Sequence, residues 1–284
     1  MLVLPDVTLV VVETRCHELM RLSLADMVAK VQFGGGVIVH TDKSELIPLP
    51  VPVEYIAVPN WPTKVAQGGF YYMEAGHAAK TSHVLLMEWD AGLRNIECWS
   101  DEFLQYDYIG APWVFSLGLR YRKHTVGNGG FLLMSKKLVD HIYEQRGAHK
   151  MHTDMEVAQS NRIRLENEIG AKWAPEEVAI RFSYEHYGHA GHRIRALPSF
   201  GYHDIFNWPL ALEREEVVKR TRLVMQNEYV VRNTSKLKLL STAWPWVRQE
   251  VGAEAFDAAI RHHYPRQQNP LIRPRAFKRV GVKA

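Results

Sequence analysis

Two carboxylates separated by one residue, Glu88 and Asp90, have the residue type and the spacing to do chemistry. They follow an apolar run at 84–87 that is typical of a buried strand, and Gly92 lets the chain turn away just after them. Ligands of open α/β sheets bind outside the carboxyl ends of the strands. Two acids at such an end can hold a divalent cation, and the cation can neutralise a diphosphate. The alternative is a strand end whose carboxylates bond loop N–H groups.

A glycine-rich segment, Gly127-Asn128-Gly129-Gly130, precedes a second apolar strand at 131–134. Glycines at these positions permit a close approach to the backbone, for example by a sugar or a diphosphate. A β-bulge or tight turn is the alternative. The segment matches neither the G-x-G-x-x-G fingerprint of dinucleotide folds nor a Walker A loop.

Further candidate groups come later in the chain. Glu176 and Glu177 follow Pro175 at a predicted helix start, where one could act as a general base towards a hydroxyl; a simple capping pair is the alternative. His203 precedes Asp204, and an acidic neighbour can orient an imidazole ring. The other histidines form no zinc signature, and the sequence has no G-x-S-x-G elbow.

The 284 residues suit one large α/β domain with an added helical part. The net charge of +4 depends on the segment 261–284, which has basic residues and no acid, so a nucleic-acid-binding fold is not expected. Two cysteines, Cys16 and Cys98, indicate a reducing compartment rather than a disulfide framework. With no signal peptide and no run of about 18 apolar residues, we expect a cytoplasmic protein.

The order of predicted elements indicates a βαβ unit, with a strand at 7–13, a helix at 18–31 and a strand at 37–40. Further strands are expected at 54–58, 84–87, 106–109, 131–134 and 200–203. Helices are expected at 64–80 and 152–169, from 135 and from 175, and over 213–262 with a break at 244–245. We therefore divide the chain into a catalytic domain at 1–210, a helical extension at 211–262 and a basic tail at 263–284.

The ordered set of motifs resembles nucleotide-sugar-dependent glycosyltransferases of the GT-A fold, and within them a mostly bacterial family filed as a domain of unknown function. The resemblance covers roughly residues 5–245. Its matching stretches are VTLVVVET at 7–14, VPNWPTKVAQGGFYY at 58–72, EWD at 88–90, YDYIGAPW at 106–113, GNGGF at 127–131, HTDM at 152–155, APEEVA at 174–179 and FGYHDIFNWP at 200–209.

The resemblance implies a Rossmann-like, mixed but mainly parallel sheet flanked by helices. It implies that Glu88 and Asp90 stand at the D-x-D metal and diphosphate element, with Glu in place of the first Asp. His203 then completes a Mn²⁺ or Mg²⁺ site, and Gly129 and Gly130 face the donor. Glu177, with Glu176 beside it, matches the catalytic base of inverting members; a transfer with retention of configuration is the alternative if no base is positioned there.

Other residues are candidates for binding the donor and the acceptor. Strand ends near Glu13-Thr14 and Asp42 would hold the base and ribose of a UDP- or GDP-sugar. Lys64 pairs with a phosphate or is a solvated helix-start lysine. Asn128 and Asp154 would lie on the acceptor side. The indoles of Trp113 and Trp208 offer faces for a sugar ring, with burial in the core as the alternative.

The expected function is a transfer of sugar to a carbohydrate or glycolipid acceptor, in surface polysaccharide or glycoconjugate synthesis. A nucleotidyltransferase that makes nucleotide-sugars is an alternative, although ETRCHEL at 13–19 lacks the glycines of its first loop. A non-catalytic nucleotide- or sugar-binding protein on the same fold is a third interpretation. The basic tail either contacts an anionic membrane at the inner face or is a solvated end.

Overall fold

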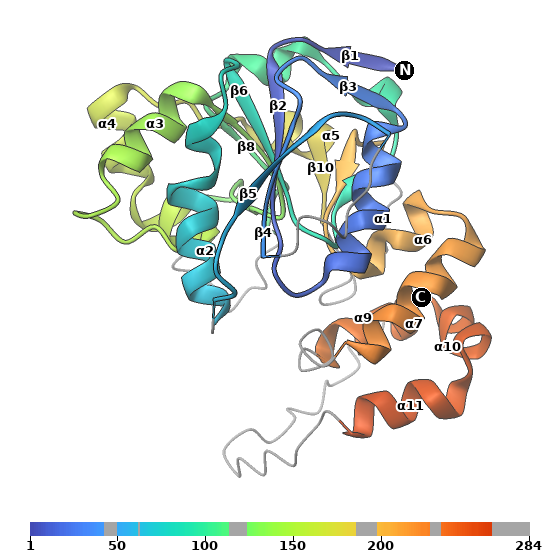
Figure 1. Ribbon diagram of the computed structural model, residues 1–284. Coiled ribbons are helices and arrows are strands. Elements are labelled where there is room, and N and C mark those ends of the chain that lie inside the picture. Colours follow the sequence, from blue (N-terminus) through green and yellow to red (C-terminus); the bar gives the residue numbers. More distant parts are fainter. Residues whose placement is uncertain (43–49, 62, 114–123, 186–197, 228–233, 263–284) are drawn as a thin grey trace, which may run out of the picture.

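The computed structural model describes residues 1–42, 50–61, 63–113, 124–185, 198–227 and 234–262. Its centre is a six-stranded sheet with helices on both faces (Figure 1). The first four strands in sheet order are parallel, and the fifth runs antiparallel to its two neighbours. The order is β5 (Val53–Ala57), β4 (Val37–Thr41), β2 (Val7–Val12), β6 (His83–Met87), β9 (Phe131–Ser135), β8 (Tyr108–Ile109). The fold is thus mixed α/β with a mainly parallel sheet, as predicted.

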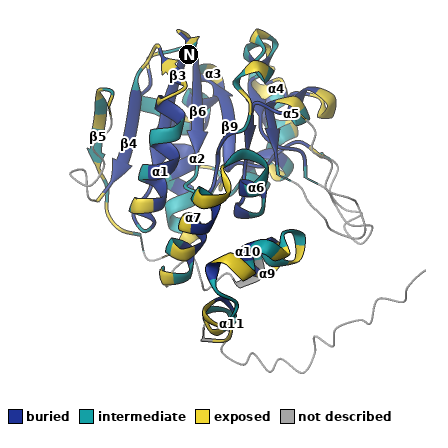
Figure 2. Cartoon of the chain, turned by 90° about the vertical axis from the view of Figure 1, so that its right-hand side faces the viewer, coloured by how far each residue is buried: buried dark blue, intermediate teal, exposed yellow. Residues whose placement is uncertain are grey.

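Burial on both faces explains why β2 is a continuous apolar run rather than an alternating one. Leu9 and Val11 join a core beneath helix α1 (His17–Val28), and Val10 and Val12 join a second core. That second core contains side chains of α2 (Lys64–Met73) and α3 (Lys136–Glu144). Figure 2 shows the central strands as the buried layer between these helices.

Two small sheets flank the central one. Strand β1 (Leu2–Leu4) pairs in parallel with β3 (Val31–Phe33). Strand β11 (Gly201–Tyr202) lies between β10 (Ser183–Tyr184) and β7 (Gly92–Leu93), parallel to the first and antiparallel to the second. Because β7 follows β6 after a short turn, this three-stranded sheet brings residue 203 close to the carboxyl end of β6.

The C-terminal helices pack against the body of the protein, below and to the right of the sheet in Figure 1. They are α6 (Trp208–Ala211), α7 (Arg214–Gln226), α9 (Thr234–Ala243), α10 (Pro245–Val251) and α11 (Ala253–His262). A third core joins their apolar side chains to Cys16 and Leu19, at the start of α1. The predicted boundary at 210–211 falls inside α6, so the extension begins without a linker. The tail at 263–284 lies outside the described residues.

Several predicted boundaries are wrong. The helix expected at 18–31 ends at Val28 because Val31 belongs to β3. The helix expected at 64–80 ends at Met73, and a 3-10 turn, η2 (Ala75–Ala78), follows it. The strand expected at 106–109 is reduced to β8, because the 3-10 turn η4 (Asp101–Gln105) ends just before it.

The remaining helices lie in the second half of the chain. The region 152–169 contains a helix as predicted, α4 (Arg162–Ile169), and a π-helical turn (Glu156–Ser160) precedes it. Helix α5 (Glu176–Phe182) begins after Pro175 as predicted. Short 3-10 turns, η3 (Ile96–Cys98) and η7 (Ile205–Asn207), complete the described elements. Among the helices of the described ranges, none has both the length and the apolarity to cross a membrane.

Candidate metal centre

The candidate site is formed by Glu88, Asp90 and His203, each offering one ligand atom within 4.8 Å of the others. Nε2 of His203 lies 3.4 Å from Oδ1 of Asp90 and 3.7 Å from Oε2 of Glu88. The acids stand just beyond the carboxyl end of β6, and the histidine follows β11. The structure therefore brings together all three metal ligands that the sequence analysis named.

Local hydrogen bonds fix the turn that carries the two acids. The backbone N–H of Glu88 donates to the Gly130 carbonyl (2.8 Å), and that of Ala91 donates back to the Glu88 carbonyl (3.1 Å). The first bond continues the antiparallel pairing of β6 with β9 by one residue. The acidic turn and the glycine-rich segment are thus hydrogen-bonded neighbours.

Side chains from elsewhere in the protein come very close to the backbone of the glycine-rich segment, at two positions where that segment has no side chain of its own. A Cβ on Gly130 would lie 2.2 Å from the His203 ring, and one on Gly129 would lie 2.0 Å from the Tyr72 hydroxyl. The Asn128 side chain accepts a hydrogen bond from the Gly130 N–H (3.0 Å). The groups that come close to these glycines are thus the His203 ring and the Tyr72 hydroxyl, and the approach of a sugar or diphosphate to Gly129 and Gly130 stays a prediction.

The atoms of the triad fit a divalent cation. Oδ1 of Asp90 and Nε2 of His203 are buried and make no hydrogen bond with any described group, although they face each other at ion-pair distance. Buried polar atoms without a partner are costly, and a cation between them would satisfy both. Carboxylate oxygens and imidazole nitrogen are ligands that Mn²⁺ accepts, while Mg²⁺ prefers oxygen.

The charges of the triad depend on one another. Burial opposes ionisation of Glu88, but Lys64 and His203 outweigh it and lower the pKa of this carboxyl to about 2. The pKa of Asp90 is likewise lowered despite burial, chiefly by Lys236 and His203. Burial would lower the pKa of His203, but Asp90, Glu185 and Glu88 raise it well above its usual value. A cation that binds the imidazole must therefore displace a proton.

Two residues outside the predicted set contact the triad. Oε1 of Glu185 lies 3.2 Å from Nδ1 of His203, the arrangement by which carboxylates orient metal-binding histidines. Nζ of Lys236 lies 2.6 Å from Oδ2 of Asp90 and 3.2 Å from Oδ2 of Asp204. Lys236 comes from α9, far along the chain from Asp90, and no local pattern in the sequence marks it.

Two predicted residues lie beside the triad. Nζ of Lys64 is 3.9 Å from Oε2 of Glu88, with 74% of the lysine side chain exposed. Asp154 accepts a hydrogen bond from the Met155 N–H. Burial, with a further contribution from the charge of Glu88, raises the pKa of Asp154. Asp154 is thus a carboxylate that is basic for its type and electrostatically coupled to the triad.

The residues expected to hold the nucleoside lie at the carboxyl ends of β2 and β4. Oε1 of Glu13 accepts hydrogen bonds from the N–H groups of Arg15 (2.6 Å) and Cys16 (2.7 Å), in the turn that leads into α1. Burial raises the pKa of Glu13 to about 7. The Thr14 hydroxyl is 3.4 Å from Oδ1 of Asn60, next in the chain to Trp61. Oδ1 of Asp42 is 2.8 Å from Nε2 of His17.

Other predicted residues lie away from the triad or pack into the core. Glu176 and Glu177 are exposed at the start of α5, and within the described residues no hydrogen bond or ion pair joins their side chains to the triad. The Trp113 ring fills the space where a Cβ of Gly127 would lie (2.3 Å), and the loop at 114–123 lies outside the described residues. Trp208 is fully buried against Trp89, which confirms the core alternative for this indole.

Comparison with known protein families finds a match over part of the chain. Residues 69–203, slightly less than half of the chain, match the model of a family described as a protein of unknown function (DUF5672). No curated protein matches the chain. The matched stretch contains the two acids, the glycine-rich segment and Asp154, and it ends at His203. The chain is therefore similar, over the region that contains the whole triad, to a family of unknown function.

Proposed function

We propose that this protein is a glycosyltransferase of the GT-A type, which transfers a sugar from a nucleotide-sugar to a hydroxyl acceptor. The observation that carries the proposal is the triad of Glu88, Asp90 and His203 at the carboxyl edge of a mainly parallel sheet. Ligands of open α/β sheets bind at that edge. Two acids and a histidine there suit a cation–diphosphate complex better than a phosphate alone, which the acids would repel.

Different residues along this edge of the sheet would bind the nucleoside, the cation and the phosphates. The pocket for the nucleoside would be formed by Glu13, Thr14 and Asp42, at the ends of the neighbouring strands. A Mn²⁺ or Mg²⁺ ion bound by the triad would stabilise the charge that develops on the leaving diphosphate. Lys64, already within ion-pair range of Glu88, would add a second positive charge to the same phosphates.

An inverting transfer also needs a base for the acceptor hydroxyl. We place this role at Asp154, because a largely buried carboxyl with a raised pKa accepts a proton more readily than an exposed one. Asn128, on the glycine-rich segment, is proposed to contact the acceptor or the transferred sugar. Glu177, which the resemblance implies as the base, stays a prediction that the same assay tests.

The function is tested by incubating the protein with UDP- and GDP-sugars, with Mn²⁺ or Mg²⁺, and measuring release of the nucleoside diphosphate. We expect slow release of one nucleoside diphosphate through transfer of the sugar to water, and faster release when a hydroxyl acceptor takes the sugar instead. Asp154→Asn is expected to lower the turnover number at least about a hundredfold with little change in nucleotide affinity. Glu177→Gln is measured in parallel.

The possible results separate the interpretations. Binding without any turnover would favour a non-catalytic nucleotide-binding protein. Formation of a nucleotide-sugar and pyrophosphate from a sugar phosphate and a nucleoside triphosphate would favour a nucleotidyltransferase. A large loss of turnover in Glu177→Gln, with no loss in Asp154→Asn, would indicate that Glu177 is the base.

A further inference from the structure

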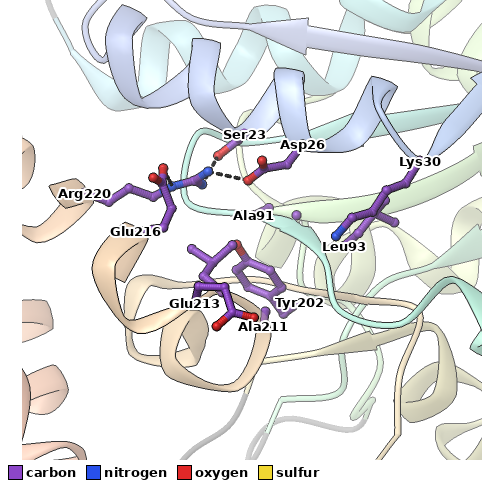
Figure 3. Close-up of a pocket in the computed structure, with 12 residues that line it drawn as sticks. Ser23, Asp26, Lys30, Ala91, Leu93, Tyr202, Ala211, Glu213, Glu216 and Arg220 are labelled. Atoms are coloured by element: carbon purple, nitrogen blue, oxygen red, sulfur yellow. Dashed lines mark hydrogen bonds and ion pairs between the residues drawn. The ribbon is translucent and has the colours of Figure 1, made fainter. Parts of the chain in front are cut away.

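The C-terminal extension is fixed to the body beside the acidic turn. Arg220 of α7 is buried and forms hydrogen bonds with Ser23 (3.1 Å), Glu216 (2.9 Å) and Asp26 (Figure 3). These groups line a cavity of about 270 Å³ next to Ala91. The guanidinium thus makes hydrogen bonds with side chains of both α1 and α7. Its paired charges anchor α7 next to the turn that carries Asp90.

The same extension places a positively charged side chain, Lys236, next to the metal ligand Asp90. The Lys236 side chain is 18% exposed and that of Asp90 is fully buried, and their charged atoms are 2.6 Å apart. Asp204 is the other carboxylate in contact with this lysine, and the Trp89 ring lies 5.9 Å from its Nζ. The two carboxylate oxygens of Asp90 therefore have different neighbours: Oδ2 faces Lys236, and Oδ1 faces His203.

We propose that Lys236 weakens the binding of a lone divalent cation at the Glu88–Asp90–His203 site, so that the cation binds firmly only together with a diphosphate. The inference rests on the proposed function, because it concerns the same cation site. It adds a residue that tunes the site and couples the cation to the nucleotide. The lysine lies outside the matched region at 69–203.

The argument is electrostatic. A cation on Oδ1 of Asp90 would lie within a few ångströms of the Lys236 ammonium, where like charges repel even at an effective dielectric constant of about 20. The lysine also takes up part of the negative charge that attracts the ion. A diphosphate brings negative charge of its own, and it interacts favourably with both cations at once.

The position of Asp90 does not depend on the lysine alone. Its side chain is fully buried, and the hydrogen bond from Ala91 to Glu88 closes the turn around it. Removing the ammonium is therefore expected to leave the carboxylate in place, with more of its charge available to the ion. A role of Lys236 in setting the affinity of the site for the cation can therefore be distinguished from a role in positioning Asp90.

The experiment is a titration of the full chain with MnCl₂ by calorimetry at pH 7.5, with and without saturating UDP or GDP. Lys236→Met is expected to bind Mn²⁺ alone at least about tenfold more tightly than the wild type, because the repulsion is removed. The nucleotide should then increase Mn²⁺ affinity much less in Lys236→Met than in the wild type. Lys238→Met, the same change at an exposed position of α9, is the control and should behave as wild type.

Equal or weaker Mn²⁺ binding by Lys236→Met would overturn the inference, and weaker binding would indicate that the lysine positions Asp90. No Mn²⁺ binding by the wild type, with or without nucleotide, would instead overturn the metal site of the proposed function.

If Lys236→Met does not fold, Asp204→Asn provides the test. Asparagine tolerates the positive φ of residue 204 and can still accept the hydrogen bond from Ile205. It leaves Lys236 paired with Asp90 alone, so Mn²⁺ binding should weaken at least about threefold. Unchanged or tighter binding would contradict the inference.

Discussion

At the scale of single residues, the metal centre requires that position 130 has no side chain. The His203 ring occupies the place where a side chain at this position would begin, and the ring's Nε2 is the atom that faces both acids. A glycine here is therefore a steric requirement of the histidine, not of the backbone, since no positive φ occurs at Gly130.

Gly130→Ala should displace the His203 ring, because the new Cβ would lie 2.2 Å from it. We expect Mn²⁺ affinity, measured by calorimetry with UDP present, to fall at least about tenfold, as for loss of a ligand-orienting group. Gly147→Ala is the matched control, since a Cβ there meets no atom within 4 Å. Unchanged affinity in Gly130→Ala would show that the ring does not bind the ion.

Glu13 gives the stability of the protein a pH dependence. Its pKa is about 7 in the fold against 4.5 when unperturbed, because burial disfavours the charged form. The stabilisation that this group gives is fully present below its unfolded pKa and is lost as the pH rises through 7, so the free energy of unfolding falls over that interval.

Glu13→Gln keeps an acceptor for the N–H groups of Arg15 and Cys16 but cannot ionise. The variant should gain stability relative to wild type between pH 5 and pH 8, by up to about 3 kcal/mol. Urea unfolding of both proteins at pH 5, 6, 7 and 8 measures the difference. A difference that stays constant with pH would show that Glu13 titrates normally.

At the scale of elements, the small sheet of β7, β10 and β11 aligns the histidine with the acids. Tyr202 pairs with Gly92 across this sheet, and the backbone N–H of His203 donates to the Tyr184 carbonyl (3.0 Å). The chain then continues from β10 to Glu185, which reaches Nδ1 of His203. The element therefore delivers both the ligand and the group that orients it.

Glu185→Gln removes the charge that orients His203 while keeping a hydrogen-bond acceptor. We expect Mn²⁺ affinity to fall about tenfold to a hundredfold, the usual effect of losing a carboxylate behind a metal-binding histidine. Glu168→Gln is the control, because it changes a surface pair with His141 in the same way. Equal affinities of the two variants would exclude an orienting role for Glu185.

The sequence predicts the central elements well because their signals are local. The six buried residues of β2 and the apolar run before Glu88 mark strands without reference to the rest of the chain. The three ligands could also be named, since strand-end acids and a histidine with an acidic neighbour are visible in sequence. Short pairings such as β1 with β3 carry too few residues for a periodic pattern.

Contacts made by the extension could not be predicted. In the sequence, Lys236 is one of two lysines in the segment that forms α9, and only packing against the third core brings it to Asp90. Glu185 is likewise one acid before a segment at 186–197 that lies outside the described residues. The sequence also favours Glu176 and Glu177 for their place at a helix start, whereas Asp154 is the carboxyl whose pKa is raised by burial and by the charge of Glu88.

At the scale of the whole molecule, the extension is part of the same packed unit as the sheet. Its apolar side chains share a core with α1, and Arg220, which is buried, and Lys236, which is partly exposed, are paired with acids of the body. A protein that lacked residues 211–262 would leave Asp90 without its lysine and α1 with an exposed apolar end.

Arg220→Met should destabilise the whole protein, because it leaves Asp26 and Glu216 without their buried partner. We expect a loss of about 2–4 kcal/mol in the free energy of unfolding by urea, since both carboxylates keep some access to water. Arg248→Met removes an exposed pair with Asp257 and should cost less than about 1 kcal/mol. A loss confined to the C-terminal helices, seen as a separate transition, would contradict a single packed unit.

The central claim is a cation–diphosphate site at Asp90, and its most direct test is thermal unfolding with UDP and GDP, each with and without Mn²⁺. In the wild type, one nucleotide should stabilise the fold only when Mn²⁺ is present, by about 2.7 kcal/mol at a hundredfold excess over its dissociation constant. Asp90→Asn should lose this stabilisation, and Asp6→Asn, at the opposite end of the strands, should keep it. Stabilisation without metal, equal stabilisation of Asp90→Asn, or none by either nucleotide would contradict the account.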